Sequence, residues 1–264
     1  TTADPTTATA APTTSTTAAP TTTVFKSLCA QPTFRILNGQ RVTDDCPYSG
    51  VSNITTANGT ISACNAVFTV TNVSGTVKPV FVTAKICLEI IKQMKEYNIT
   101  YDIQIGVQRY PIVSPIFTLS DGPKGTGFIE FNLYYIKLLD YLGKCQKSAC
   151  PYNKSTMDGL VDFTNCKALS WGSSDADTLE QNGLYEAPIA LSQSNCSSIQ
   201  DMGDTADAMC FRTVSGRNLI CSADSGGPVY CSATSNKEWI LIGVMSLHMT
   251  CDDTPEVKVL PYPG

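Results

Sequence analysis

The chain has a single histidine, His248, among its 264 residues, and this scarcity excludes several kinds of site. Structural zinc sites take cysteine and histidine ligands, often with two of the cysteines spaced as CxxC. Twelve cysteines are present, but no CxxC pair occurs among them. We therefore expect no metal site and no cofactor.

Long apolar runs and basic clusters are missing as well. No stretch approaches the ~20 apolar residues of a membrane-spanning helix, so we expect no membrane span. The net charge is −5 and the isoelectric point is near 4.9. An acidic chain without a Lys/Arg-rich segment is not expected to bind nucleic acid or an anionic membrane surface. No signal peptide is visible, which favours a mature chain or a fragment of a longer precursor.

Cysteine and asparagine usage favours an oxidising compartment. An even number of irregularly spaced cysteines predicts a framework of disulfides, as in secreted proteins. Six Asn-X-Ser/Thr sequons favour the same location, although the last of them is weaker because a cysteine occupies its middle position. We expect a secreted, extracellular glycoprotein with acceptor sites at Asn53, Asn58, Asn72, Asn98, Asn153 and Asn195.

The character of the sequence changes after residue 24. Residues 1–24 are almost wholly Thr, Ala and Pro and are expected to be disordered, either as a mucin-like O-glycosylated segment or as a plain flexible linker. From residue 25 onward, short β-branched runs alternate with turn residues, which predicts an all-β barrel or sandwich. In one segment Leu88, Ile91 and Met94 recur at helical spacing and predict a helix over residues 86–97. The expected strands include residues 66–70, 78–83, 103–107 and 239–245.

One loop carries a catalytic signature. Residues 221–231 read CSADSGGPVYC and resemble the nucleophile loop of the trypsin/chymotrypsin-like serine peptidases, with Ser225 at the position of the reactive serine. Five more blocks resemble, in the family's order, its activation site, its histidine block, its aspartate strand, its Cys…Gly-Trp-Gly block and its substrate-aligning strand. These blocks are residues 35–39, 82–87, 131–138, 166–172 and 243–248.

The resemblance implies an all-β fold of two six-stranded antiparallel β-barrels. The domain would span residues 25–264, with the first barrel in residues 36–150 and the second in residues 151–264. The chain ends at Gly264, before the helix that closes the family's fold, so we expect that helix to be lost or cut off. The implied disulfides are Cys64–Cys87, Cys166–Cys231, Cys196–Cys210 and Cys221–Cys251, with Cys29–Cys150 and Cys46–Cys145 for the last four cysteines, whose pairing stays open.

The same resemblance indicates a broken catalytic triad. Ile86 stands at the histidine position and Asn132 at the aspartate position, so Ser225 alone is retained. A serine hydroxyl is a weak nucleophile until a base takes its proton, and isoleucine accepts none. Ala223 replaces the first glycine of the oxyanion hole, where the backbone conformation disfavours a Cβ. Losing one oxyanion donor costs about 2.7–4 kcal/mol of transition-state stabilisation.

Two other residues are candidates for the missing base. His248 falls on the rim of the substrate cleft, where we expect it to narrow the pocket rather than reach Ser225. Lys85 precedes the vacant histidine position, but a lysine base must be buried before it loses its proton near neutral pH. We expect neither residue to restore catalysis.

The specificity pocket is altered too. Leu219 occupies the position of the aspartate that anchors basic residues in trypsin-type enzymes, and Ser246 belongs to the substrate-aligning strand. Glu256 falls where a glycine of the pocket wall often stands. It either enters the pocket or is a solvated surface residue, and both readings stay open.

The activation machinery is retained in part. In the family, cleavage after a basic residue frees an N-terminus that pairs with the aspartate beside the reactive serine. Arg35, Ile36 and Asp224 stand at these three positions. The Arg35–Ile36 bond is either cut by another protease or an inert remnant, and both alternatives stay open.

These expectations favour a catalytically inactive, secreted serine-peptidase homologue that acts as a binding or regulatory module. The expected partner is another extracellular protein, namely a protease, an inhibitor or a substrate. Two alternatives stay open. One is a weak or unorthodox endopeptidase that uses Ser225, and the other is a glycosylated structural or surface protein.

Overall fold

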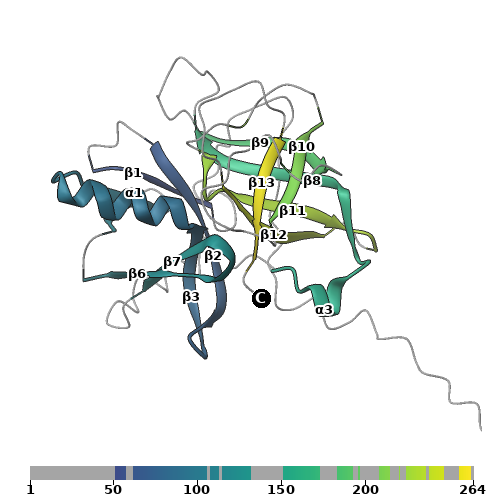
Figure 1. The fold of residues 1–264 in the computed structure, drawn as a ribbon, viewed down its shortest axis with the longest axis horizontal. Helices are drawn as coiled ribbons and strands as arrows, with labels where there is room; N and C mark the ends of the chain where they lie inside the picture. Colours follow the sequence, from purple (N-terminus) through teal and green to yellow (C-terminus); the bar gives the residue numbers. More distant parts are fainter. Residues whose placement is uncertain are drawn as a thin grey trace, which may run out of the picture.

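Antiparallel strands dominate the part of the chain that the computed structural model describes. Figure 1 shows two groups of strands side by side, an N-terminal sheet on the left and a C-terminal barrel on the right. The structure describes residues 51–57, 62–105, 108–112, 115–131, 151–172, 183–192, 196, 208–214, 220, 224–235, 238–246 and 256–262.

The N-terminal group is a seven-stranded sheet with the strand order β5-β4-β1-β2-β3-β7-β6. Strands β1, β2 and β3 lie in its interior and are paired on both sides. The strands are β1 (Val51–Thr56), β2 (Ser62–Val73), β3 (Thr76–Ala84), β4 (Tyr101–Ile105), β5 (Gln108–Pro111), β6 (Phe117–Asp121) and β7 (Thr126–Phe131), with a 3-10 turn η2 (Pro123–Gly125) before β7.

An aromatic cluster fills the core of this sheet. The ring of Phe81 lies 5.4 Å from the rings of both Phe68 and Phe131, and Phe117 lies 5.3 Å from Phe131. Tilted aromatic pairs of this kind contribute about 0.5–1.5 kcal/mol each beyond the area that they bury. Phe68 and Phe81 lie directly opposite each other in the β2–β3 pair, so their rings project from the same face of the sheet.

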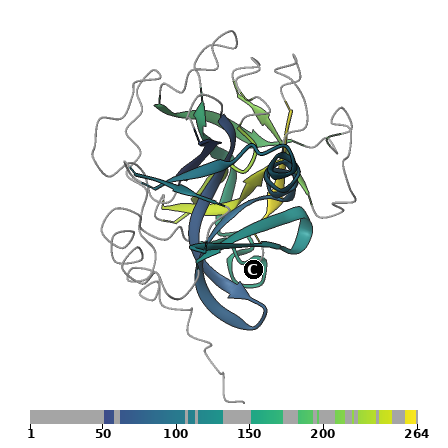
Figure 2. The same ribbon diagram turned by 90° about the vertical axis from the view of Figure 1, so that its left-hand side faces the viewer.

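The helix predicted over residues 86–97 is present as α1 (Lys85–Glu96). Leu88 and Ile91 are buried and Met94 is partly buried, as the helical spacing predicted. The helix approaches β7 closely at Gly127, where a Cβ would lie 2.5 Å from Cδ1 of Leu88. α1 projects away from the barrel at the left of Figure 1 and faces the viewer in Figure 2.

α1 ends in a hydrogen-bonded cap centred on Asn98. The backbone N–H of Asn98 donates to the carbonyl of Lys95, and that of Ile99 donates to Met94, both over 3.0 Å. Asn98 has a φ of 58°. This is the Schellman arrangement, in which the residue after the helix adopts the left-handed conformation that asparagine tolerates well.

The C-terminal group is a closed barrel with the strand order β10-β13-β12-β11-β8-β9. A short helix, α3 (Lys154–Met157), precedes it and begins at Asn153, whose side chain accepts a hydrogen bond from the backbone N–H of Ser155. The barrel strands are β8 (Val161–Gly172), β9 (Gly183–Leu191), β10 (Met209–Thr213), β11 (Pro228–Ala233), β12 (Trp239–Met245) and β13 (Glu256–Pro261).

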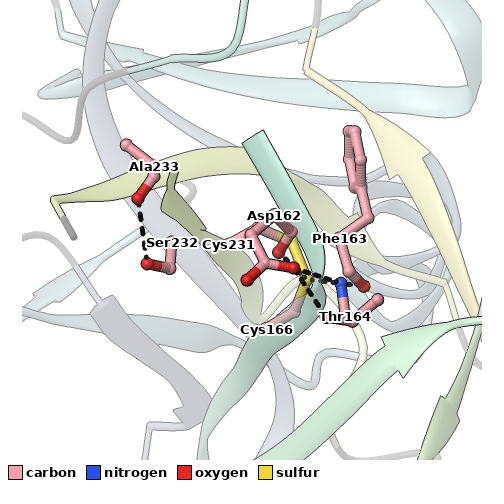
Figure 3. Close-up of a disulfide and its surroundings, with 7 residues drawn as sticks. All are labelled: Asp162, Phe163, Thr164, Cys166, Cys231, Ser232 and Ala233. Atoms are coloured by element: carbon pink, nitrogen blue, oxygen red, sulfur yellow. Dashed lines mark hydrogen bonds between the residues drawn. A yellow bond between two sulfur atoms is a disulfide. The ribbon is translucent and has the colours of Figure 1, made fainter. Parts of the chain in front are cut away.

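Disulfides cross-link segments within each of the two groups. Cys166 and Cys231 are direct partners across β8 and β11 and are bonded to each other (Figure 3). Beside this bond the carboxylate of Asp162 accepts hydrogen bonds from the backbone N–H and the hydroxyl of Thr164, at 3.1 and 2.6 Å. The other two described disulfides are Cys64–Cys87 and Cys196–Cys210. All three pairs are among those the resemblance implied, whereas Cys221–Cys251, Cys29–Cys150 and Cys46–Cys145 lie outside the described residues.

One apolar cluster spans both groups of strands, and a second lies within the C-terminal half. Tyr230, Leu241 and Tyr262 of the C-terminal half belong to the same buried cluster as the aromatic residues of the N-terminal sheet. Hydrogen bonds cross the junction too, because the Trp171 indole donates to the carbonyl of Val51 over 3.0 Å. The junction is therefore packed, and a loop that lies on it has both halves as its support.

The all-β, trypsin-like fold class is confirmed. The C-terminal half is a closed six-stranded barrel, while the described strands of the N-terminal half form a seven-stranded sheet without a pairing between β5 and β6. The expected strands coincide with β2, β3, β4 and β12, apart from residues 106 and 107, which lie outside the described residues. Within the described residues no helix is long and apolar enough to cross a membrane.

Candidate active site

The turn that carries Ser225 is shaped by two glycines. Gly226 has a φ of 80°, and a Cβ there would lie 1.9 Å from the carbonyl oxygen of Asn65 and 2.2 Å from Oγ1 of Thr83. Gly227 is enclosed as well, since its Cβ would lie 2.3 Å from the carbonyl oxygen of Leu169. Both the conformation and the space at Gly226 thus require glycine.

Hydrogen bonds hold this turn against the end of β12. The N–H of Gly226 donates to the carbonyl of Met245, and the N–H of Met245 donates to the carbonyl of Gly227, each over 2.8 Å. Within the turn, the N–H of Gly227 donates to the carbonyl of Asp224 over 3.0 Å. Backbone hydrogen bonds therefore hold the Ser225 turn from the barrel side.

Asn65 of β2 holds the turn from the other side. Its N–H donates to the carbonyl of Ser225 over 2.7 Å, and its own carbonyl accepts from the Thr83 hydroxyl over 2.6 Å. Its side chain reaches β8, where Nδ2 donates to Oγ of Ser170 over 2.9 Å and Oδ1 accepts from the N–H of Trp171 over 2.7 Å. Asn65 is fully buried. Its bonds connect four segments at the junction of the two halves, namely β2, β3, β8 and the Ser225 turn.

Ile86 lies in the first turn of α1, on the N-terminal side of the junction. It is half-buried and packs against the N-terminal core. The next residue, Cys87, is bonded to Cys64, which precedes Asn65, the residue bonded to Ser225. This chain of covalent and hydrogen bonds connects the segment of Ile86 to the Ser225 turn.

Lys85 is engaged at the surface. Its Nζ lies 3.3 Å from a carboxylate oxygen of Asp121 on β6 and 3.9 Å from Glu89 on α1, and its side chain is 44% exposed. Lys92 also reaches Asp121, over 3.4 Å. The hydrogen bond from Lys85, with help from Lys92, lowers the pKa of the Asp121 carboxyl below its usual value. An exposed, paired ammonium lacks the burial that a lysine base requires.

Ser225 itself is 2% exposed, and its neighbour Asp224 is half-buried. Both residues have interaction partners in the structure. At the end of β12, Ser246 is half-buried, and its N–H donates to the carbonyl of Lys258 over 2.9 Å. Ser225 and Ser246 are therefore connected through the backbone, because Met245, which directly precedes Ser246, is hydrogen-bonded to Gly226 and Gly227 of the Ser225 turn.

Glu256 begins β13 and is half-buried. It lies directly opposite Arg212 of β10 in the antiparallel register. Opposite charges in directly facing positions stabilise a strand pair by a few tenths of a kcal/mol to about 1 kcal/mol. Glu256 therefore has a position within the barrel wall and is not a fully solvated residue.

Several predicted site residues lie outside the described residues, and the roles assigned to them stay predictions. They are Asn132 at the aspartate position, Ala223 at the oxyanion position, Leu219 of the pocket, His248, and Arg35 and Ile36 of the activation site. Among the described residues, no group of three or more His, Cys, Asp or Glu side chains is arranged to hold a metal ion.

Sequence reasoning missed Asn65 and Ser170 as parts of this site. Asn65 follows Cys64 inside an apolar strand, and a polar residue at a core position is a signal that it has bonding partners. Ser170 stands in the place of the first glycine of the Cys…Gly-Trp-Gly block. The bond between these two residues joins positions 105 residues apart, and no local pattern reports such a contact.

Comparison with known proteins gives one family. The family described as Trypsin matches residues 78–260. Transmembrane protease serine 7 of Mus musculus is 33% identical over 88 residues, which are 33% of this chain and 10% of that protein. The Homo sapiens protein of the same name is 34% identical over 83 residues, or 31% of this chain and 10% of that protein. Trypsin I-P1 of Gallus gallus is 33% identical over 95 residues, or 33% of this chain and 34% of that protein. The chain thus matches about a tenth to a third of the length of these relatives.

Proposed function

The chain belongs to the trypsin family of serine peptidases, and we propose that it is an inactive member, a pseudoprotease that acts outside the cell as a binding or regulatory module. The observation that carries the proposal is the residue at the family's histidine position. By the resemblance of residues 82–87 to the family's histidine block, Ile86 falls at that position, and it lies in the first turn of α1. The one histidine of the chain, His248, follows Ser225 in the sequence. Without a base the Ser225 hydroxyl stays a weak nucleophile.

The retained features support a scaffold role for the Ser225 turn. Gly226 and Gly227 are needed for the shape of the turn and for its fit against Asn65 and Leu169. These residues serve folding, whereas Ile86 and Asn132 stand where the family has its base and the aspartate that orients that base. A chain that keeps the shape of a site and loses its chemistry is suited to recognition by loops on a rigid support.

The proposal extends to organisation and location. We assign residues 25–264 to the trypsin-like domain, with residues 36–150 as its first half and 151–264 as its second, and residues 1–24 to a mucin-like segment. The disulfides and sequons favour secretion. The partner would be an extracellular protease, an inhibitor of proteases or a protease substrate.

Hydrolysis of a peptide library by the secreted protein tests the proposal. The protein is assayed before and after cleavage between Arg35 and Ile36, beside Ser225→Ala as the background. Ser232→Ala is the matched control, because Ser232 is another buried serine, 1% exposed, away from the turn. We expect no turnover above the Ser225→Ala background in any form. Turnover that Ser225→Ala abolishes and Ser232→Ala keeps would sink the proposal.

One alternative has a specific observation in its favour. The Ser225 turn is intact in shape, and the matched relatives bear the names of proteases, so a weak endopeptidase is the second candidate. A fluorophosphonate probe separates the two, because it reacts with activated serines. Labelling that depends on Ser225 would favour the endopeptidase, and the absence of labelling would favour the pseudoprotease.

A further inference from the structure

The sequons of this chain differ sharply in their surroundings. Asn72, Asn98 and Asn153 are exposed, whereas Asn53 is 0% exposed. The three exposed asparagines lie on β2, after α1 and before α3, which are spread over the molecule (Figure 1). Asn58 and Asn195 lie outside the described residues.

Asn53 lies inside the sheet with its whole sequon. Asn53, Ile54 and Thr55 are each 0% exposed, and β1 is paired with β2 on one side and β4 on the other. Asn53 faces Asn65 directly across the β1–β2 pair. Facing residues of an antiparallel pair project from the same side of the sheet. The Asn53 side chain therefore points toward the junction where Asn65 bonds β8, and an attached sugar would occupy packed protein.

Asn98 is the opposite case. It is the left-handed residue of the cap that ends α1, held by backbone bonds to Lys95 and flanked by the bond from Ile99 to Met94. Its side chain is thus presented from a fixed, exposed corner. Its two neighbours are exposed and apolar, with Tyr97 at 67% and Ile99 at 40%.

Exposed apolar side chains cluster around the exposed sequons. Among the residues that the structure describes, six large apolar side chains are at least 40% exposed, namely Val70, Tyr97, Ile99, Leu160, Leu191 and Val214. Tyr97 and Ile99 adjoin Asn98, and Val70 precedes Asn72 by two residues. Residues two apart on a strand project from the same face, so Val70 and Asn72 share one surface. Half of the six thus lie where a sugar on a neighbouring asparagine would cover them.

We propose that the secreted protein carries N-linked glycans at Asn72, Asn98 and Asn153 and none at Asn53, and that the Asn98 glycan covers the apolar pair Tyr97 and Ile99. The proposal rests on the secretion part of the proposed function and not on the loss of catalysis. Chains glycosylated at Asn53 during synthesis cannot seat β1 between β2 and β4. They are therefore excluded from the folded, secreted product.

Site mapping tests the occupancy. The full chain is produced through the secretory pathway, the glycans are removed enzymatically in ¹⁸O-water, and the labelled peptides are identified by mass spectrometry. We expect label at Asn72, Asn98 and Asn153 and none at Asn53. Label at Asn53 in folded protein, or an unlabelled Asn98, would overturn the proposal. Either result is separable from the proposed function, because peptide hydrolysis is measured independently of the sugars.

Matched variants sharpen the result. Thr55→Val abolishes the Asn53 sequon with a side chain of equal shape, so we expect secretion with no change in glycan mass. Asn98→Asp abolishes its sequon and keeps a residue that tolerates the left-handed conformation. We expect this variant to lose one glycan. A loss of glycan mass in Thr55→Val would contradict the burial argument.

Retention on a hydrophobic-interaction column tests the covering of Tyr97 and Ile99. We expect Asn98→Asp to be retained longer than the wild type, and Tyr97→Ser with Ile99→Ser in the Asn98→Asp background to reverse the shift. Asn153→Asp is the control for the loss of a glycan as such, because it keeps the acceptor oxygen that caps α3. If Asn98→Asp is retained no longer than Asn153→Asp, the covering role is overturned.

Discussion

Asn65 and Ser170 are hydrogen-bonded across the junction of the two halves, with Nδ2 of Asn65 donating to Oγ of Ser170 over 2.9 Å. The same asparagine bonds the carbonyl of Ser225 through its backbone N–H. Because Asn65 is fully buried, each of these bonds is made away from water. The bond between Asn65 and Ser170 therefore links the support of the Ser225 turn to the second half of the molecule.

Asn65→Ala should destabilise the protein strongly. It removes the side-chain bonds to the buried Ser170, whose hydroxyl keeps a 3.3 Å bond to the carbonyl of Trp171, and to the N–H of the half-buried Trp171. An N–H left without its partner costs about 1–3 kcal/mol and the lost Ser170 bond about 0.5–1.5 kcal/mol, so we expect a loss of about 1.5–4.5 kcal/mol in the free energy of unfolding. Urea unfolding measures it. Ser170→Ala should cost less, and the double variant should cost less than the sum of the two single ones. Strict additivity would show that the two side chains act independently.

Gly226→Ala should be far more damaging than the same change at Gly75. Both glycines have positive φ angles, 80° and 83°. A Cβ at Gly226 would collide with the carbonyl of Asn65, whereas a Cβ at Gly75 meets nothing within 4 Å. We expect Gly75→Ala to cost about 1–2 kcal/mol through its conformation alone, and Gly226→Ala to prevent the native packing of the turn. Equal melting temperatures for the two variants would refute this account of the turn.

The sequence predicted the local features of this fold well. The helical spacing of Leu88, Ile91 and Met94 predicted a helix over residues 86–97, and the observed helix begins and ends within one residue of that range. Such a helix is predictable because its spacing and its ends depend on neighbours along the chain. The role of Asn65 was not predicted, because it depends on Ser170 and Ser225, which reach it only after both halves have folded. The burial of Asn53 was hidden for the same reason, since a sequon is a three-residue pattern and burial depends on β2 and β4.

Thr55→Val should stabilise the protein. Oγ1 of Thr55 is buried and has no hydrogen-bond partner among the described residues. Replacing a hydroxyl that lacks a partner by a methyl group of similar shape removes a desolvation cost, and we expect a gain of about 1 kcal/mol. Thr69→Val is the matched control, because the Thr69 hydroxyl lies 3.3 Å from the Tyr262 hydroxyl and bonds it. It should lose stability in the same denaturant series, and a loss in Thr55→Val as well would contradict the prediction.

Tyr230 should make the protein sensitive to alkaline pH. Burial raises the pKa of the Tyr230 phenol above its usual value of 10.0. A raised pKa means that the folded state favours the neutral phenol over the phenolate. The contribution of Tyr230 to the free energy of unfolding is therefore fully present below pH 10. It is then lost as the pH rises toward the folded-state pKa, at about 1.4 kcal/mol per pH unit.

Unfolding free energies measured between pH 9 and pH 11 test this. Tyr230→Phe should flatten the alkaline decline, whatever its effect on stability at pH 7. Tyr97→Phe is the control, because Tyr97 is 67% exposed, and it should leave the decline unchanged. A decline that is equally steep in Tyr230→Phe would assign the alkaline sensitivity to another group.

Restoring the family's histidine and aspartate should not be enough to restore catalysis. Ile86→His supplies a base in the first turn of α1, and Asn132→Asp supplies the residue that orients it in the family. Removing the orienting aspartate from a working triad costs about 10⁴ in rate, so both changes are needed. By the family resemblance, Ala223 falls at the first oxyanion position, where a missing donor costs about 10²–10³ in rate. We therefore expect little peptide hydrolysis from the double variant and at least a tenfold increase when Ala223→Gly is added, with Ser225→Ala abolishing it. Strong turnover by the double variant alone would mean that Ala223 is compatible with a working oxyanion hole and would contradict the prediction.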